Sequence, residues 1–387
     1  MNSKAKLVRI TTVPISLKVL LKGQHHFMSD YFEVIGISAE GKELHEVRDN
    51  EGIRVLPVHM TRAISPFADL KSLWELYKIL KKEKPLIVHS HTPKAGIVGM
   101  LAAKLARVPH RIHTVAGLPL METQGNKRKL LQAVEKLTYS CATKVYPNSK
   151  GLYDFILANN FTKQDKLSVV GNGSSNGINT NYFDPALFLN EEKEKIRKNL
   201  NVNSEDFVFI FVGRLVGDKG INELIKSFDK LSEENKNVKL LLVGSLESDL
   251  DPLFSETLEK INSNDNILSV GFQNDVRSFF AIADVLIFPS YREGFPNVVM
   301  QAGAMGLPSI VSNINGCNEI IENETNGLII PVKDSEHIYL AMQKMIKDDF
   351  LREKMKKNAR QMIVARYEQK KVWSLILEEY NKLVQDV

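Results

Sequence analysis

The stretch "DVLIFPSYREGFPNVVMQAGAMGLPSIVSN", residues 284–313, joins two short apolar runs through a helical pattern. The runs DVLIFPS and LPSIVSN predict buried strands, because they are brief, apolar and bounded by turn residues. The segment NVVMQAGAMG between them predicts a helix. A strand, a helix and a second strand in succession are typical of a parallel sheet that is covered by helices.

The same alternation continues outward along the chain. The second half adds the predicted strands DFVFIFVGR, VKLLLVG and NILSVGF, and the first half contains PLIVHSH, HRIHTVAG, TKVYPNS and KLSVVGN. A predicted amphipathic helix in the first half has apolar residues at the i, i+3, i+4 spacing. These residues are Leu70, Leu73, Trp74, Tyr77 and Leu80.

We therefore predict an α/β chain with two doubly wound parallel-sheet domains, and 387 residues are enough for two cores. The first domain comprises residues 1–185 and the second residues 186–370. Residues 371–387 predict a final amphipathic helix that packs back on the first domain. In open parallel sheets ligands bind outside the carboxyl ends of the strands, so we expect the functional residues there.

The composition is that of a soluble globular protein, with 43% apolar and 25% charged residues. No stretch has the length of a membrane-spanning helix or of a signal-peptide core, so we expect a cytoplasmic protein. Cys141 and Cys317 lie far apart without a C-x-x-C pattern, which argues against a disulfide framework or a thiolate metal site.

Positive charge is concentrated in the first half. Residues 1–185 contain 26 Lys and Arg against 15 Asp and Glu, whereas the rest of the chain contains 25 against 31. This charge asymmetry predicts an anionic partner, which is a phosphorylated lipid, a membrane surface or nucleic acid. Lysines that are merely solvated on helix faces explain the asymmetry about equally well. The segment GLPLMETQGNKRKLLQAVEKL has a composition that is suited to binding a leaflet surface or a lipid diphosphate. The same composition is equally consistent with a surface loop that enters a helix. The apolar and basic residues of this segment are Leu118, Leu120, Met121, Lys127, Arg128 and Lys129.

Two loops have the character of a phosphate site. In FVGRLVGDKG a strand ends at Gly213-Arg214, and a helix begins after Lys219. Two cations beside a helix N-terminus favour a diphosphate, although an ordinary strand-to-helix loop would have a similar pattern. In YREGFP the turn of Gly294, Phe295 and Pro296 lets the chain approach a ligand, and the amides of the next helix point the same way.

Several motifs resemble the retaining glycosyltransferases of family 4. They are GRLVGDKG, PSYREGFPNVVMQAGAMGLPSIVS and ENETNGLIIP, with TTVPISLKVLLKGQ, VHSHTPKAGIVGMLAAKLA and KVYPNSKGL in the first half. The bacterial members that build capsule, O-antigen and other surface polysaccharides on a polyprenyl carrier are the most similar. The resemblance implies the GT-B fold and transfer from a nucleotide sugar, such as UDP-GlcNAc or UDP-GalNAc, to a polyprenyl-diphosphate-linked saccharide. It also implies that the first domain binds the acceptor and the second the donor.

The resemblance assigns roles to individual residues. Glu293 would approach the donor sugar, and His91 would reach the reacting sugar and the acceptor. The family normally has a second glutamate eight positions after the first, and Gln301 occupies that position here. Its amide would still bind the ribose hydroxyls, at a loss of very roughly 1 kcal/mol. The residues expected to bind the nucleotide sugar are Gly23, Gly213, Arg214, Lys219, Gly294, Phe295, Pro296, Asn297 and Gln301.

The implied chemistry needs neither a cofactor nor a metal, because Arg214, Lys219 and helix amides would balance the charge of the departing diphosphate. Asp249-x-Asp251 resembles the metal-binding D-x-D of the other glycosyltransferase fold, but it lies in an acidic loop of the second half. Ala116 stands where many relatives carry a His or Arg, which leaves acceptor identity open. GNGSSNG, residues 171–177, is spaced wrongly for a dinucleotide site and is expected beside the hinge.

Two other functions stay possible on the sequence. A nucleotide-sugar epimerase shares the two-domain GT-B architecture, but its acid and base carboxylates cannot be assigned here. A nucleotide-sugar-binding protein that has lost catalysis is suggested by Gln301 and Ala116. Under the favoured interpretation the partners are a nucleotide sugar, a polyprenyl-linked acceptor and the cytoplasmic face of the inner membrane, and no nucleic acid is involved.

Overall fold

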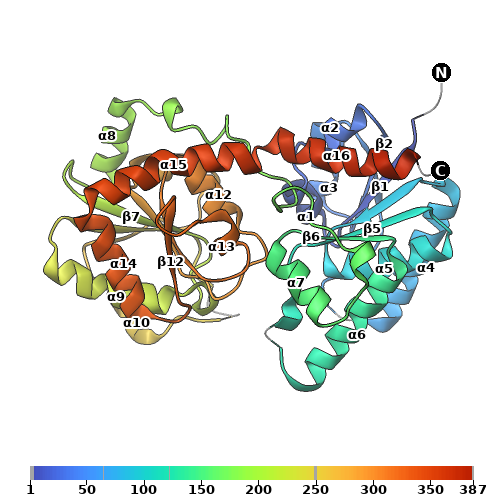
Figure 1. The fold of residues 1–387 in the computed structure, drawn as a ribbon, viewed down its shortest axis with the longest axis horizontal. Helices are drawn as coiled ribbons and strands as arrows, with labels where there is room; N and C mark the ends of the chain where they lie inside the picture. Colours follow the sequence, from blue (N-terminus) through green and yellow to red (C-terminus); the bar gives the residue numbers. More distant parts are fainter. Residues whose placement is uncertain (1–3, 64, 122, 248–250, 386–387) are drawn as a thin grey trace. The chain divides into compact units, whose positions relative to one another are not determined.

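The computed structural model describes residues 4–63, 65–121, 123–247 and 251–385, which form two compact units (Figure 1). The first unit runs to Gly177 and includes the chain from Lys370 onward, and the second is Ile178–Gln369. The second unit thus begins at Ile178, before the boundary that was predicted at residue 185. Each unit contains one parallel sheet of six strands.

In the first unit the sheet has the strand order β3-β2-β1-β4-β5-β6. The strands are β1 (Lys6–Ile10), β2 (Glu33–Ser38), β3 (Arg54–Pro57), β4 (Ile87–Ser90), β5 (His110–Val115) and β6 (Lys144–Pro147). The helices are α1 (Pro14–Leu20), α2 (Gln24–Ser29), α3 (Lys42–Glu51), α4 (Pro66–Glu83), α5 (Pro93–Leu105), α6 (Gly125–Cys141), α7 (Lys150–Ala158) and α16 (Gln369–Gln385), with short 3-10 turns η1 (Pro119–Met121) and η2 (Gln164–Lys166).

The second unit repeats this arrangement with the order β12-β11-β10-β7-β8-β9. Its strands are β7 (Phe207–Val212), β8 (Val238–Val243), β9 (Ile267–Ser269), β10 (Val285–Phe288), β11 (Ser309–Ser312) and β12 (Gly327–Ile330). Its helices are α8 (Asn190–Asn199), α9 (Ile221–Glu234), α10 (Ser255–Ser263), α11 (Arg277–Ile282), α12 (Asn297–Ala304), α13 (Cys317–Ile320), α14 (Ser335–Lys347) and α15 (Asp349–Tyr367), with 3-10 turns η3 (Pro185–Leu187) and η4 (Gly217–Lys219).

Burial on both faces explains why the central strands are continuously apolar. In β7 the four residues from Val208 to Phe211 have no exposed surface, and both neighbours in the sheet, β10 and β8, pair with it in parallel. Each such side chain contributes roughly 1.5–3 kcal/mol through burial. The two predicted doubly wound α/β sheets are therefore confirmed.

One detail of the sequence prediction is wrong. The run KLSVVGN forms no strand, because Leu167 makes only an isolated bridge to Val145 while the chain around it turns. The predicted amphipathic helix is confirmed as α4, although its apolar residues do not all face the core. Leu70 and Trp74 are 65% and 56% exposed, whereas the buried residues of α4 are Ser72, Leu76 and Leu80.

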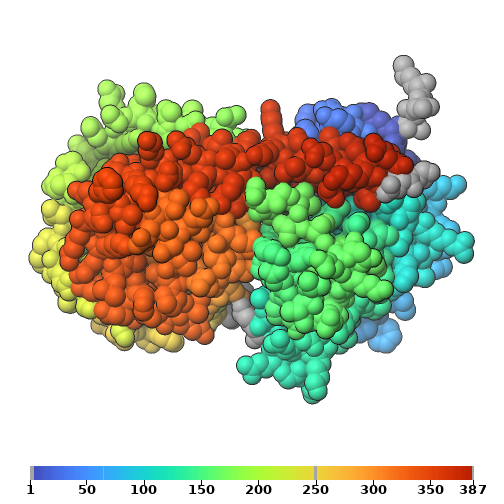
Figure 2. All heavy atoms as spheres, in the orientation of Figure 1, coloured from blue at the N-terminus to red at the C-terminus, as the bar shows by residue number. Residues whose placement is uncertain are grey.

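Helix α16 belongs to the first unit. Its Tyr380 is fully buried, and the hydroxyl contacts Arg9 Nη2 at 3.0 Å and His89 Nδ1 at 2.6 Å. Its Trp373 packs on Phe27 of α2, with ring centroids 5.4 Å apart. In Figure 2 the red atoms of α16 lie directly against the blue atoms of the first helices. The helix thus completes one face of the first sheet.

Candidate functional site

Each sheet has a topological switch point, which is the pair of neighbouring strands from which the strand order runs outward in opposite directions. In the second unit it lies between the neighbours β7 and β10, and in the first between β1 and β4. Loops that diverge from such neighbours leave a crevice at the carboxyl ends of the strands. The loop after β7 contains Arg214 and Lys219, and the loop after β10 contains Glu293, so both predicted loops reach the same edge.

Lys219 and Glu293 form the centre of the site in the second unit. Lys219 Nζ donates to Glu293 Oε1, and Ser290 Oγ donates to the same oxygen at 3.0 Å. The two paired side chains are 15% and 18% exposed, so the pair is partly accessible. Gly220 allows this approach, because its φ is +72° and a Cβ there would lie 2.2 Å from Pro289 O.

The loop that carries Glu293 is fixed by neighbours that the sequence analysis did not identify. Asn315 Nδ2 donates to Gly294 O at 2.8 Å. Gly316 has a φ of +77°, and a Cβ there would lie 2.7 Å from the same oxygen. Tyr291 donates through its hydroxyl to Glu223 at 2.7 Å. The Asn315-Gly316 pair shortly after β11 was the signal in the sequence that could have identified this turn, since this dipeptide marks turns with positive φ.

Arg214 lies in a different environment from Lys219. Its side chain is 45% exposed, and Nη1 pairs with Glu247 Oε2 at 3.0 Å. Gly213 before it is held in place, since its N–H donates to Val243 O at 2.9 Å. A further cation that the sequence analysis left without a role, Arg292, contacts Asp218 Oδ2 at 2.9 Å. The loops at the carboxyl ends of β7 and β10 therefore bring three cations together with several carboxylates.

Helix α12 starts at Asn297, directly after Phe295 and Pro296. Its small residues pack closely, because a Cβ on Gly303 would lie 2.7 Å from the Ile363 side chain of α15. Gln301 is half-buried on this helix. Within the described part of the chain its side-chain amide has no hydrogen-bond partner. The helix thus presents an amide side chain at the predicted position.

At the switch point of the first unit, His91 follows β4 and its N–H donates to Ile10 O of β1 at 3.0 Å. Its ring is 4% exposed and lies 4.1 Å from the His89 ring. Neither ring nitrogen has a partner among the described residues. Burial, with the charges of His89 and Arg9, holds the pKa of His91 well below its ordinary value. The imidazole is therefore neutral near pH 7.

Gly23 has a structural reason to be glycine. Its φ is +78°, and a Cβ there would lie 2.6 Å from the Trp373 ring of α16. Its N–H donates to Glu51 Oε1 at 2.6 Å. A phosphate-binding role was predicted for Gly23, and packing against α16 is a second requirement on the same residue.

The acidic loop shapes the neighbouring turn. Asp249 lies outside the described residues, but Asp251 accepts through its carboxylate from the N–H of Asp218, and through its carbonyl from Gly217 at 3.1 Å. Over the described ranges there is no group of three or more side chains that could hold a metal ion. No helix in that part of the chain is both long and apolar enough to cross a membrane.

Comparison with known proteins identifies the fold and the family. Residues 32–173 match the family described as "Glycosyl transferase 4-like domain", and residues 192–362 match "Glycosyl transferases group 1". A glycosyltransferase structure from Rickettsia africae superposes with a TM-score of 0.81 at 21% identity and covers 100% of both chains. The fold and these matches define a glycosyltransferase of the GT-B fold.

Two relatives narrow the class. The "Capsular polysaccharide biosynthesis glycosyltransferase CapM" of Staphylococcus aureus is 38% identical over 98% of each chain. The "UDP-Gal:alpha-D-GlcNAc-diphosphoundecaprenol alpha-1,3-galactosyltransferase" of Escherichia coli is 31% identical and covers 94% of this chain and 93% of its own. The chain belongs to glycosyltransferase family 4, among the members of the bacterial capsule and O-antigen type.

Proposed function

We propose that this enzyme transfers a hexose or N-acetylhexosamine from a UDP-sugar, with retention, to a polyprenyl-diphosphate-linked saccharide. The donor binds at the β7–β10 edge of the second unit, and the first unit binds the acceptor. The observation that supports this most directly is the Lys219–Glu293 pair at the switch point. The printed activity of the E. coli relative, which names UDP-Gal and a diphosphoundecaprenol acceptor, supports the substrate classes.

The cations of this edge suit a donor diphosphate. Lys219 has three N–H donors and uses one for Glu293, so it can bind a phosphate oxygen without releasing the carboxylate. Arg214 is half exposed and can exchange Glu247 for a phosphate. The turn of Gly294, Phe295 and Pro296, followed by the amides of α12 from Asn297, adds neutral donors nearby.

Glu293 and Gln301 divide the remaining contacts to the donor. Lys219 and Ser290 both donate to Oε1 of Glu293, which orients the carboxylate and leaves its other oxygen for the sugar. The free amide of Gln301 binds the ribose by accepting from one hydroxyl and donating to the other. Replacement of a carboxylate by this amide weakens the ribose contact by about 1 kcal/mol.

In the transfer step an oxygen of the acceptor forms a bond to the anomeric carbon while the bond from that carbon to the diphosphate breaks. Both events take place on one face of the sugar, which gives retention. The acceptor proton passes to the departing phosphate oxygen, so no separate enzyme base is required. Lys219 and Arg214 stabilise the charge that develops on the leaving group. The neutral imidazole of His91, whose ring nitrogens have no partner among the described residues, is available to the acceptor as a hydrogen-bond partner.

A radiolabel assay tests this proposal. The purified protein is incubated with UDP-Gal, UDP-GalNAc or UDP-GlcNAc and a polyprenyl-diphosphate-linked saccharide from bacterial membranes. Label in the lipid fraction supports the proposal, and the anomeric configuration of the product decides retention. Free isomerised nucleotide sugar would instead indicate an epimerase, and binding without turnover would indicate a protein that has lost catalysis.

Matched variants then test the site itself. Lys219→Ala and Glu293→Ala are compared with Lys226→Ala and Glu259→Ala, which remove exposed side chains of the same types from α9 and α10. Loss of transfer in the first pair alone supports the proposed site. Equal loss in both pairs would contradict it.

A further inference from the structure

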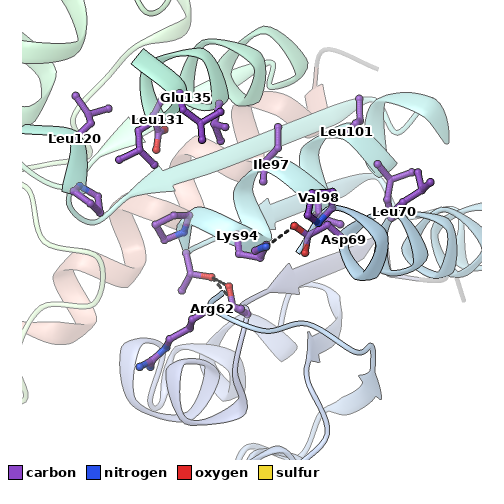
Figure 3. Close-up of a pocket in the computed structure, with 18 of the residues that line it drawn as sticks. Arg62, Asp69, Leu70, Lys94, Ile97, Val98, Leu101, Leu120, Leu131 and Glu135 are labelled. Carbon is purple, nitrogen blue, oxygen red and sulfur yellow. Dashed lines mark hydrogen bonds and ion pairs between the residues drawn. The ribbon is translucent and has the colours of Figure 1, made fainter. Parts of the chain in front are cut away.

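A large apolar groove lies in the first unit, between α4, α5 and α6 (Figure 3). Its volume is about 700 Å³, within the range of roughly 300–1,000 Å³ that is usual for ligand sites. Leu73 of α4, Ile97 and Leu101 of α5, and Leu131 of α6 line it. The cavity thus has a largely apolar lining, and all of its lining residues belong to the first unit.

One end of the groove is polar and reaches the switch point. Thr12 and Thr92 follow β1 and β4, and their hydroxyls are 2.7 Å apart. Lys94 lies beside them and pairs with Asp69 at 2.5 Å, and exposed Arg62 also lines this end. Two hydroxyls and two cations are suited to a phosphate group. The polar end therefore coincides with the edge of the sheet where a reacting group is expected.

Two apolar residues that line the groove reach the protein surface. Leu70 of α4 is 65% exposed and Leu130 of α6 is 52% exposed. The first turn of α6 adds Lys127 and Lys129, which are exposed as well. Exposed apolar side chains next to basic ones are typical of surfaces that lie on an anionic leaflet.

The lining of the groove also contains a carboxyl group, and its apolar surroundings raise the pKa of that group. Glu135 of α6 lines the groove and is 8% exposed. Burial raises the pKa of its carboxyl group to about 7. A half-neutral acid at this place leaves the interior of the groove without a strong fixed charge, which a hydrocarbon requires.

We propose that this groove holds the isoprenoid chain of the lipid-linked acceptor, with its phosphates at the Thr12–Thr92–Lys94 end. The inference rests on the proposed function and specifies how the acceptor is held. A free saccharide would leave the leucine and isoleucine walls uncovered, and a peptide would bury backbone groups without partners. A phosphorylated hydrocarbon satisfies both ends, and the exposed basic rim matches the leaflet from which it comes.

Photo-crosslinking tests binding without any requirement for transfer. The full chain is labelled with a benzophenone analogue of farnesyl diphosphate, in competition with farnesyl diphosphate, inorganic diphosphate or dodecyl phosphate. We expect crosslinks in the peptides of α4, α5 and α6, and competition by farnesyl diphosphate at least tenfold more effective than by inorganic diphosphate. Equal competition by dodecyl phosphate would show a site for any alkyl chain and overturn the assignment to an isoprenoid. Crosslinks confined to other peptides would overturn the groove.

Variants of residues that line the groove are compared with matched variants at exposed positions. Ile97→Trp and Leu131→Gln should each lower crosslinking at least tenfold, whereas Leu105→Trp and Leu137→Gln, at exposed positions on the same two helices, should leave it unchanged. The urea-unfolding midpoint is measured for all four variants, and the polar Leu131→Gln keeps the test valid where a tryptophan prevents folding. Wild-type crosslinking in both groove variants would refute the proposal.

Kinetics separate this inference from the proposed function. In Ile97→Trp the KM for a long-chain acceptor should rise at least tenfold, with the KM for the UDP-sugar and for a short-chain acceptor unchanged. Crosslinking in the groove without any transfer by the wild-type protein would refute the proposed function alone. Transfer with an unchanged long-chain KM in Ile97→Trp would refute the groove alone.

Discussion

Glu135 provides a quantitative test of the electrostatics of the first unit. Its carboxyl pKa is raised from 4.5 to about 7 by burial, so the folded state binds a proton that the unfolded state has already released. The stability of the unit is therefore undiminished below pH 4.5 and falls as the pH rises toward 7. A shift of this size corresponds to about 3 kcal/mol, fully expressed above pH 7.

The variant Glu135→Gln removes the titrating proton while it retains a side chain of similar shape. We expect it to be more stable than the wild-type protein by up to about 3 kcal/mol at pH 8, and to differ by less than about 1 kcal/mol at pH 5. The two tryptophans of the chain, Trp74 and Trp373, both lie in the first unit. Urea unfolding followed by tryptophan fluorescence therefore reports on this unit.

Glu378→Gln is the control, because this residue is exposed on α16 of the same unit. It should leave the free energy of unfolding and its pH dependence unchanged. If Glu135→Gln retains the wild-type loss of stability between pH 5 and pH 8, the carboxyl group is not the source of that loss. The reasoning from burial would then be refuted.

Three further predictions concern the second unit. Lys219→Ala and Glu293→Ala should each reduce turnover at least about 100-fold with an unchanged unfolding midpoint, and full activity in both would contradict the site. Gln301→Glu should bind UDP equally well or up to about 1 kcal/mol more tightly by calorimetry, and a large loss of affinity would show that the amide has another role. Gly244→Ala should destabilise the unit by roughly 3 kcal/mol in thermal unfolding, because its Cβ would lie 1.7 Å from Gly213 O, and an unchanged midpoint would contradict this.

The local pattern of the sequence predicted the elements of the second unit well. The runs that begin at residues 206, 238 and 284 all contain strands, because strands buried on both faces must be apolar throughout. It failed at KLSVVGN, where the composition is that of a strand but Leu167 has only one bridge to Val145. A short apolar run does not specify whether a neighbouring strand has an open edge to receive it.

The candidate site was predicted in part. The motif residues Lys219 and Glu293 were named from the sequence, and the structure brings them into contact. The pairing of Arg214 with Glu247 and the support from Asn315 were not predicted. These partners are far apart in sequence and follow different strands. Contacts of this kind depend on the order of the strands, which no local pattern specifies.

The sequence by itself determined the two doubly wound sheets and the family, because hydrophobic periodicity and short motifs are local properties. Only the tertiary structure decided that β10 lies beside β7, which joins Glu293 to Lys219. It also decided that Trp74 of α4 faces outward while Leu73 lines a groove with α5 and α6. The physical reason is that the face a helix buries is set by the neighbours against which it packs.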